Sequence, residues 1–191
     1  MRQSGIILLN FGGPRSLEEI PVFLFEIIRD PNTIQLPLPQ VLQDRLAARV
    51  SRRRSLKLRE QYQAIGGASP IVPATERIAE ALQRALQAAL GESARTPPLL
   101  VAHRYLQGHT RAAVAELKRL GVQRLFASPL YPNFSYATTG SSLEQLQHEL
   151  DRAGWEGDLR VWRSHPDTPG FLEAHATRLE DTLREGAPPP E

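Results

Sequence analysis

The sequence predicts an α/β protein with a doubly wound parallel sheet. Short, continuous apolar runs alternate with segments whose apolar residues recur at helical spacing. Such runs are typical of strands that helices cover on both faces. Right-handed crossovers then bring the carboxyl ends of the strands to one edge, where folds of this class bind their ligands. The loops that follow strands are therefore the first places to look for function.

The first elements are a strand and a helix. The run 6–9 predicts a buried strand, which Asn10 to Pro14 end with a glycine pair and a proline. A helix from about 16 to 29 follows, with Ser16 as its N-cap and acidic residues in its first turn. Asp30 and the proline after it predict the end of that helix.

The next hundred residues continue the alternation. Segment 34–54 mixes apolar residues, prolines and arginines, which predicts an irregular flap plus a helix. Residues 62–70 form a turn-rich patch, and 74–90 carry leucines every four residues, as a helix does. The remaining pattern predicts, in order, strand 97–105, a helix with apolar residues from 113 to 120, strand 123–129, helix 141–153, strand 159–162 and helix 171–183.

Composition excludes several classes of protein. The 191 residues suffice for one domain with its own core. Absence of cysteine excludes disulfides, thiolate zinc sites and cysteine-ligated clusters. The net charge is only +2, and the basic cluster 52–54 lacks interleaved aromatic residues, so no nucleic-acid partner is expected. With no secretory segment and no apolar run of membrane-spanning length, we expect a cytoplasmic location.

Two loops after strands carry aromatic or cationic residues. Phe11 precedes a glycine pair that lacks the spacing and the lysine of a phosphate loop, so it lies either on a flat ligand or in the core. Arg104 and Tyr105 end a predicted strand, where side chains face the ligand crevice of an open sheet. The alternative is a surface arginine beside a packed tyrosine.

Two further segments have compositions suited to binding. Arg54, Tyr62 and Ser69 surround a second glycine pair, an arrangement that can hold carboxylates and an aromatic plane. Residues 128–142 are dense in hydroxyls and aromatic rings, although these can also serve only as turn formers and as the cap of the next helix. The five histidines show no metal-ligand spacing, so no resident metal site is expected.

Four motifs in order resemble those of the ferrochelatase family: LLNFGGP, EQYQAIGGASPI, AHRY and LYPNFSYATTGSS. The resemblance runs from Gly5 to about Leu183. It implies a chelatase-type, Rossmann-like fold of two lobes with porphyrin in the cleft between them. Residues 1–165 would form the N-terminal lobe, and 166–191 a connecting helix and proline-rich end leading toward a second lobe. The substrates would be ferrous iron and a porphyrin, protoporphyrin IX or coproporphyrin III, with no tightly bound cofactor.

The resemblance also assigns residues. Phe11 matches a residue that lies over the macrocycle, and Arg54, Tyr62 and Ser69 match positions that engage the propionates or the pocket lip. Arg104 and Tyr105 match accessory catalytic residues on the metal-entry side. The hydroxyl-rich loop matches pocket-lining residues, namely Tyr131, Ser135, Thr139 and Ser142.

The family's catalytic base is a histidine in a Ser-Ala-His motif, with a partner glutamate further on, and the sequence contains neither motif. His165 and His175 do not occupy it. We therefore expect the chain to stop before the base and to be inactive alone. The alternatives are a non-catalytic porphyrin- or haem-binding protein or partner subunit, and a cobalt or nickel tetrapyrrole chelatase. Segment 34–54 resembles the family's lip, which implies contact with a membrane surface.

Overall fold

A computed structural model describes residues 3–91 and 95–186. Four parallel strands form one sheet in the order β2-β1-β3-β4: β1 (Gln3–Asn10), β2 (Leu99–His103), β3 (Val122–Pro129) and β4 (Asp158–Val161). The helices are α1 (Ile20–Arg29), α2 (Gln40–Ala64), α3 (Ile71–Leu90), α4 (His109–Arg119), α5 (Ser141–Arg152) and α6 (Pro169–Arg184). The predicted α/β class and the parallel sheet are confirmed.

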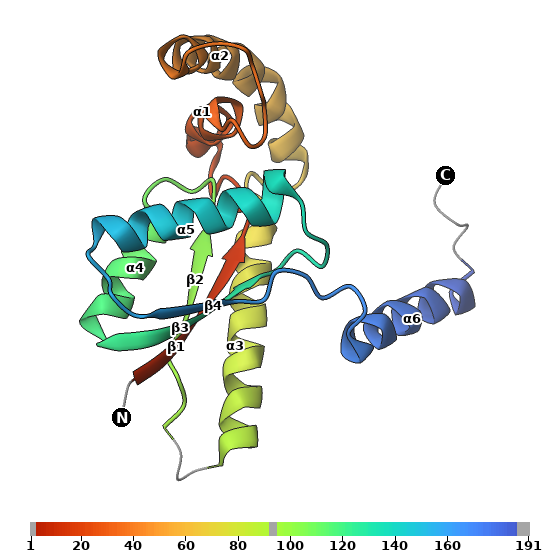
Figure 1. Ribbon diagram of the computed structural model, residues 1–191. Coiled ribbons are helices and arrows are strands. Elements are labelled where there is room, and N and C mark those ends of the chain that lie inside the picture. Colours follow the sequence, from red (N-terminus) through yellow and green to blue (C-terminus); the bar gives the residue numbers. More distant parts are fainter. Residues whose placement is uncertain (1–2, 92–94, 187–191) are drawn as a thin grey trace.

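The helices form layers around this sheet. Helices α4 and α5 lie on one face, and α3 lies on the other (Figure 1). Helices α1 and α2 pack on each other and stand over the edge where the strands end. The sequence therefore builds a doubly wound core with a helical pair placed above the carboxyl edge of the sheet.

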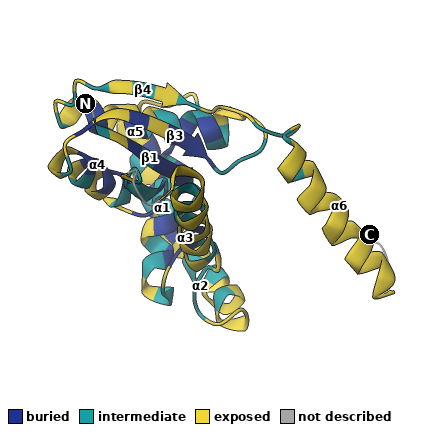
Figure 2. Ribbon diagram, turned by 90° about the horizontal axis from the view of Figure 1, so that it is seen from below, coloured by how far each residue is buried: buried dark blue, intermediate teal, exposed yellow. Residues whose placement is uncertain are grey.

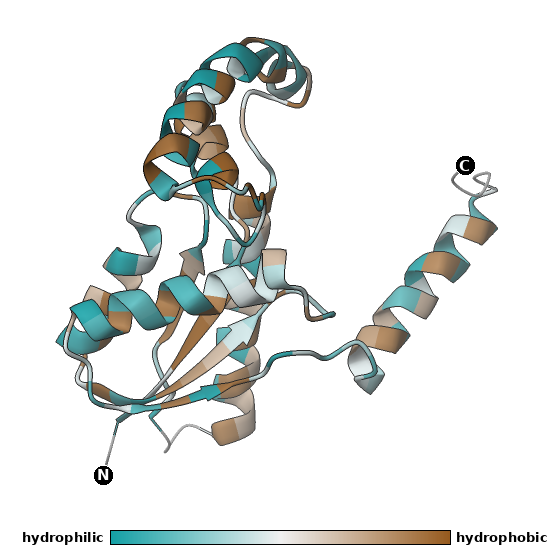
Figure 3. Ribbon diagram, turned by 45° about the horizontal axis from the view of Figure 1, so that its top comes forward, coloured by the Kyte–Doolittle hydropathy of each residue, from teal (hydrophilic) through white to brown (hydrophobic). Residues whose placement is uncertain are grey.

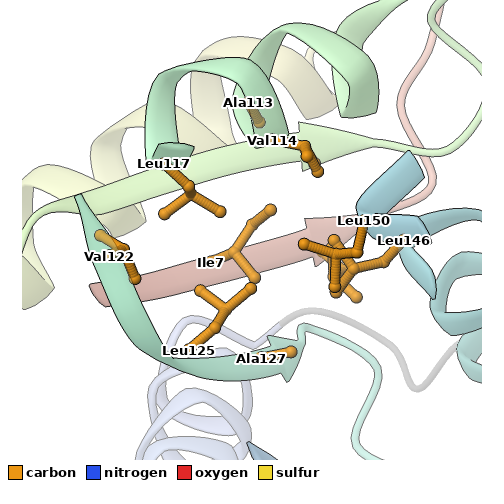
Figure 4. Close-up of a cluster of buried hydrophobic side chains, with 11 residues drawn as sticks. Ile7, Ala113, Val114, Leu117, Val122, Leu125, Ala127, Leu146 and Leu150 are labelled. Atoms are coloured by element: carbon orange, nitrogen blue, oxygen red, sulfur yellow. The ribbon is translucent and has the colours of Figure 1, made fainter. Parts of the chain in front are cut away.

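The main core lies between the sheet and the α4–α5 layer (Figure 4). Ile7 of β1, Leu117 of α4 and Leu146 of α5 are fully buried there. Alternate strand residues point to this face, which explains why Ile7 and Leu9 share one cluster. Figure 3 shows hydrophobic residues gathered along the strands. The opposite face is covered less completely, since Phe126 of β3 keeps 39% of its surface exposed.

Helix α2 is longer than the sequence predicted. It continues to Ala64, into the segment expected to be turn-rich, and the chain turns only at the glycine pair that follows. Packing against α1 stabilises it: Ala47 is fully buried, and the Gln43 amide donates to the carbonyl oxygens of Ile28 and Ile34. The flap before it, up to Pro39, is irregular as predicted.

The first helical segment begins without the capping bond that the sequence predicted. Ser16 begins the first helical segment but makes no side-chain capping bond, and Leu17–Glu19 form a 3₁₀ turn before α1, so the predicted cap is wrong.

Helix α6 extends away from the sheet and buries none of its residues (Figure 2). The proline-rich end at 187–191 lies outside the described residues. Among those described, no helix has the length and apolar character needed to cross a membrane.

His103, the last residue of β2, is fully buried, and neither of its ring nitrogens has a hydrogen-bond partner among the described residues. Its ring packs edge-on against that of His109, with centroids 5.0 Å apart. Burial, together with the neighbouring His109 and the charge of Arg15, lowers the pKa of His103 to about 4. The folded protein therefore holds this imidazole neutral.

This burial predicts an acid sensitivity. Between pH 6.5 and about 4 the unfolded chain binds a proton at His103 and the folded chain does not, so stability falls as the pH is lowered through this window. We expect the unfolding free energy of the unmodified chain to fall by about 3 kcal/mol across that window. In His103→Leu this fall should be absent. Urea denaturation at stepped pH measures it, with exposed His148→Leu as the control. An unchanged pH slope in His103→Leu would contradict the assignment.

Candidate functional site

The carboxyl edge of the sheet holds the loop Asn10–Pro14 in a fixed path. Backbone amides of Arg104 and Tyr105 donate to the carbonyl oxygens of Asn10 and Phe11, at 2.8 and 3.0 Å. The amide of Ser69 donates to the carbonyl oxygen of Pro14 at 2.8 Å. Three segments that the sequence singled out therefore meet at this edge.

Two glycines make this meeting possible. Gly12 has a φ of +84°, a left-handed conformation that favours glycine. Gly13 has no such angle, but a Cβ on it would lie 2.5 Å from Cβ of Ser69. The glycine pair thus serves close packing of the β1 loop against Ser69, in addition to any role beside a ligand.

A buried carboxylate organises the centre of the site. Asp30 follows α1, and 2% of its surface is exposed. Its Oδ2 atom accepts hydrogen bonds from Nη2 of Arg104 and the hydroxyl of Tyr105, both at 2.8 Å, and from the hydroxyl of Ser141 at 2.5 Å. Nε of Arg104 also donates to the Ser141 hydroxyl at 2.6 Å. We call Asp30, Arg104, Tyr105 and Ser141 the Asp30 cluster.

The surroundings of the Asp30 cluster fix its protonation. Burial alone would raise the pKa of Asp30, but the Ser141 hydrogen bond, the Arg104 charge and the Tyr105 hydrogen bond outweigh it and lower that pKa. Burial raises the pKa of Tyr105, and the Asp30 carboxylate raises it further. At neutral pH the cluster therefore contains an ionised aspartate, a charged arginine and a neutral phenol.

Aromatic rings extend the Asp30 cluster toward α1. The rings of Phe11 and Tyr105 meet at an angle with centroids 4.5 Å apart, and Phe23 lies 6.3 Å from Phe11. The Arg104 guanidinium lies 4.9 Å from the Tyr105 ring centroid. Phe11 is half-buried in this group, so part of its ring remains available to a ligand. Tyr105 itself is 1% exposed, which agrees with the packed tyrosine considered from the sequence.

The other predicted site residues lie around this centre. Burial raises the pKa of Tyr62, which pairs with Ser69, while Arg54 is exposed on α2. Burial raises the pKa of Tyr131 to about 12, and its hydroxyl lies 3.4 Å from that of Ser142. Two residues of the hydroxyl-rich loop differ in exposure: Thr139 is buried and Ser135 is exposed. Their ligand roles stay predictions.

The arrangement resembles one wall of a cleft more than a closed pocket. A hollow of about 240 Å³ adjoins Tyr105, Phe23 and Arg15, which is less than most small-molecule sites require. A larger hollow, about 420 Å³, lies elsewhere, over the sheet face around Ile6 and Phe126. The Asp30 cluster and its rings, rather than the larger hollow, hold the groups with chemistry.

Sequence reasoning did not identify Asp30 or Thr33 as site residues. Thr33 lies three positions after Asp30, and its hydroxyl is 2.6 Å from that of Tyr105. Asp30 carried only the signal of a helix end, which many aspartates share.

A doubly wound α/β protein with a charged and aromatic cluster at the carboxyl edge of its sheet belongs to the class that binds ligands at that edge. Comparison with known proteins identifies the family within this class. A sequence model of the ferrochelatase family matches residues 3–190, and the chain belongs to that family. The resemblance stated from the four motifs is confirmed.

Relatives named ferrochelatase agree with this assignment. That of Synechococcus sp. strain RCC307 is 40% identical over 182 residues, which are 94% of this chain and 46% of the relative. That of strain WH7803 is 38% identical over 191 residues, 99% of this chain and 48% of the relative. That of Gloeothece citriformis is 39% identical over 185 residues, 96% and 46% respectively. The chain thus spans about half the length of these relatives.

The close approach of Gly13 to Ser69 gives a test of the site's packing. We expect Gly13→Ala to lower the unfolding free energy by about 1–3 kcal/mol, because the added methyl group overpacks the contact with Ser69. Gly170→Ala is the matched control, since a Cβ there meets open space. Urea denaturation of both variants measures the difference. Equal unfolding free energies of the two variants would show that the loop accommodates the added methyl group, and would contradict the prediction.

Proposed function

We propose that these residues form the porphyrin-binding wall of a ferrochelatase, the enzyme that inserts ferrous iron into a porphyrin in haem biosynthesis. The observation that carries the proposal is the Asp30 cluster at the carboxyl edge, where the Phe11 ring meets that of Tyr105 edge-on and Arg104 is paired with Asp30. A flat, anionic macrocycle suits a half-exposed ring beside fixed cations. Membership of the ferrochelatase family supports the substrate class.

The cluster binds and orients but does not remove protons. Metal insertion releases two pyrrole protons, which a base must accept at the macrocycle. Arginine stays protonated, Tyr105 has a raised pKa, and the Asp30 carboxylate already accepts its hydrogen bonds inside the protein. We infer that the base lies outside the Asp30 cluster, and that Arg104 orients iron or water on the entry side while the buried Tyr105 packs against its guanidinium.

The propionates require cations or donors at the rim. Arg54 is exposed on α2, the helix that stands over the edge, and Tyr62 and Ser69 lie where that helix turns toward α3. We propose that these three residues engage the propionates, with Phe11 over the macrocycle. Tyr131, Ser135, Thr139 and Ser142 would line the pocket. The division into a lobe over 1–165 and a connecting segment over 166–191 accompanies this proposal.

The first test is an anaerobic titration of the chain with protoporphyrin IX, followed at the Soret band. We expect saturable binding that Arg104→Ala weakens by about tenfold or more, because a charge-assisted hydrogen bond contributes about 1.5–3 kcal/mol. Tyr105→Phe is made alongside, and Arg178→Ala in the exposed helix α6 is the control. Absence of any Soret change in the unmodified chain would overturn the porphyrin proposal.

Addition of ferrous iron separates the candidate functions. Binding without metalation agrees with a base outside the Asp30 cluster, whereas rapid metalation would show that a residue of this chain supplies it. Cobalt and nickel, tested on a protein that metalates, distinguish a ferrochelatase from a chelatase for another tetrapyrrole.

We also propose that segment 34–54 contacts a membrane surface. Leu38, Val41, Leu42 and Leu46 are exposed apolar residues at helical spacing, and arginines follow them along α2. An apolar stripe beside cations is the pattern of a helix that lies on an anionic surface.

Flotation with anionic liposomes tests this contact. We expect Val41→Glu to lower the bound fraction, because a carboxylate on the apolar stripe must leave water and faces anionic lipid. Leu179→Glu on α6 is the control, since Leu179 is 62% exposed and Val41 64%. Equal flotation of the two variants, or no flotation of the unmodified chain, would contradict the proposed membrane contact.

A further inference from the structure

The turn that follows α1 joins three parts of the molecule. Amides of Thr33 and Ile34 donate to the Asp30 carbonyl oxygen at 3.0 and 2.9 Å, and the Asn32 amide donates to Oδ1 at 2.9 Å. Gln43 of α2 donates to the carbonyl oxygen of Ile34 at 3.0 Å. One residue, Asp30, thus closes the turn with its backbone and Oδ1 while its Oδ2 faces the sheet.

The partners of Oδ2 come from distant elements. Arg104 and Tyr105 follow β2, and Ser141 begins α5. Arg104 keeps 16% of its side chain exposed, whereas Asp30 keeps 1%. The aspartate is therefore out of reach of a ligand, and the arginine that it holds is not.

We propose that Asp30 is a positioning residue that aims the Arg104 guanidinium into the ligand cleft and locks the α1–α2 pair to the carboxyl edge of the sheet. The inference rests on the proposed function only for the identity of the ligand. Two of the three guanidinium nitrogens of Arg104 are held in place. Nη2 donates to Asp30 directly, and Nε donates to the Ser141 hydroxyl, which in turn donates to Asp30. We infer that the remaining donors reach a ligand through the 16% of the Arg104 side chain that stays exposed.

A purely structural aspartate would stabilise the fold without controlling Arg104. Glu149 of α5 offers that comparison within the same chain. It is 8% exposed and pairs with Arg111 of α4 at 3.2 Å, about two helical turns further along α5 than Ser141. Its conversion to glutamine removes the charge of a buried carboxylate whose arginine partner keeps 59% of its side chain exposed, so it separates loss of a buried charge from loss of positioning.

The experiment uses ¹⁵N-labelled chain without ligand and follows hydrogen exchange of the Arg104 Nε–H, assigned by its loss in Arg104→Lys. We expect Asp30→Asn to accelerate this exchange about tenfold or more, because a charge-assisted partner of the guanidinium is lost. Glu149→Gln should leave the rate unchanged. Unchanged exchange in Asp30→Asn, in a variant that still unfolds cooperatively, would overturn the proposal.

Porphyrin binding gives the second readout. If Asp30 acts through Arg104, the double variant Asp30→Asn/Arg104→Ala binds protoporphyrin IX no more weakly than Arg104→Ala alone. Additive losses would overturn the proposal. If the unmodified chain binds no porphyrin, the proposed function fails, while the exchange measurement still decides whether Asp30 positions Arg104.

Discussion

The ionised carboxylate of Asp30 is the constraint on which the rest of the site depends. A buried charge is tolerated only when donors surround it, and here the donors come from the end of β2 and the start of α5. Removing one partner of a buried ion pair typically costs about 3–5 kcal/mol, because the other charge is left uncompensated. The loop after β1, the β2 end and the α1–α2 pair must therefore reach their places together, and the ligand-facing edge is fixed before any ligand arrives.

The main elements of the fold could be predicted because burial leaves a direct trace in the sequence. Ile6–Leu9 is apolar without interruption because helices cover both faces of β1, and α3 repeats its leucines because one side meets the sheet. The length of α2 left no such trace. The residues that α2 buries are Gln43, Ala47 and Ser51, which form no apolar repeat, and nothing in the sequence stops the helix before Gly66. Only the tertiary contact with α1 therefore shows how far the helix runs.

The site could be predicted only in part, for the same kind of reason. Arg104 and Tyr105 were predictable because a strand end in a parallel sheet has a known direction. Asp30 was not, because its partner Arg104 lies 74 positions away and an aspartate before a proline has a sufficient local explanation as a helix stop. Which hydroxyl of the loop 128–142 belongs to the cluster was equally hidden: Ser141 does, at the first turn of α5.

The protonation states of the cluster separate binding from chemistry. Asp30 is held ionised by its donors, and burial together with the Asp30 carboxylate raises the pKa of Tyr105, so neither residue exchanges protons near neutral pH. His103, two residues before Tyr105, is buried with its pKa lowered to about 4, and its ring nitrogens are sealed from the cleft. This edge of the sheet therefore presents charged and aromatic groups whose protonation stays fixed near neutral pH. Under the proposed function, such a wall would hold the porphyrin in one orientation while a base outside the Asp30 cluster takes its protons.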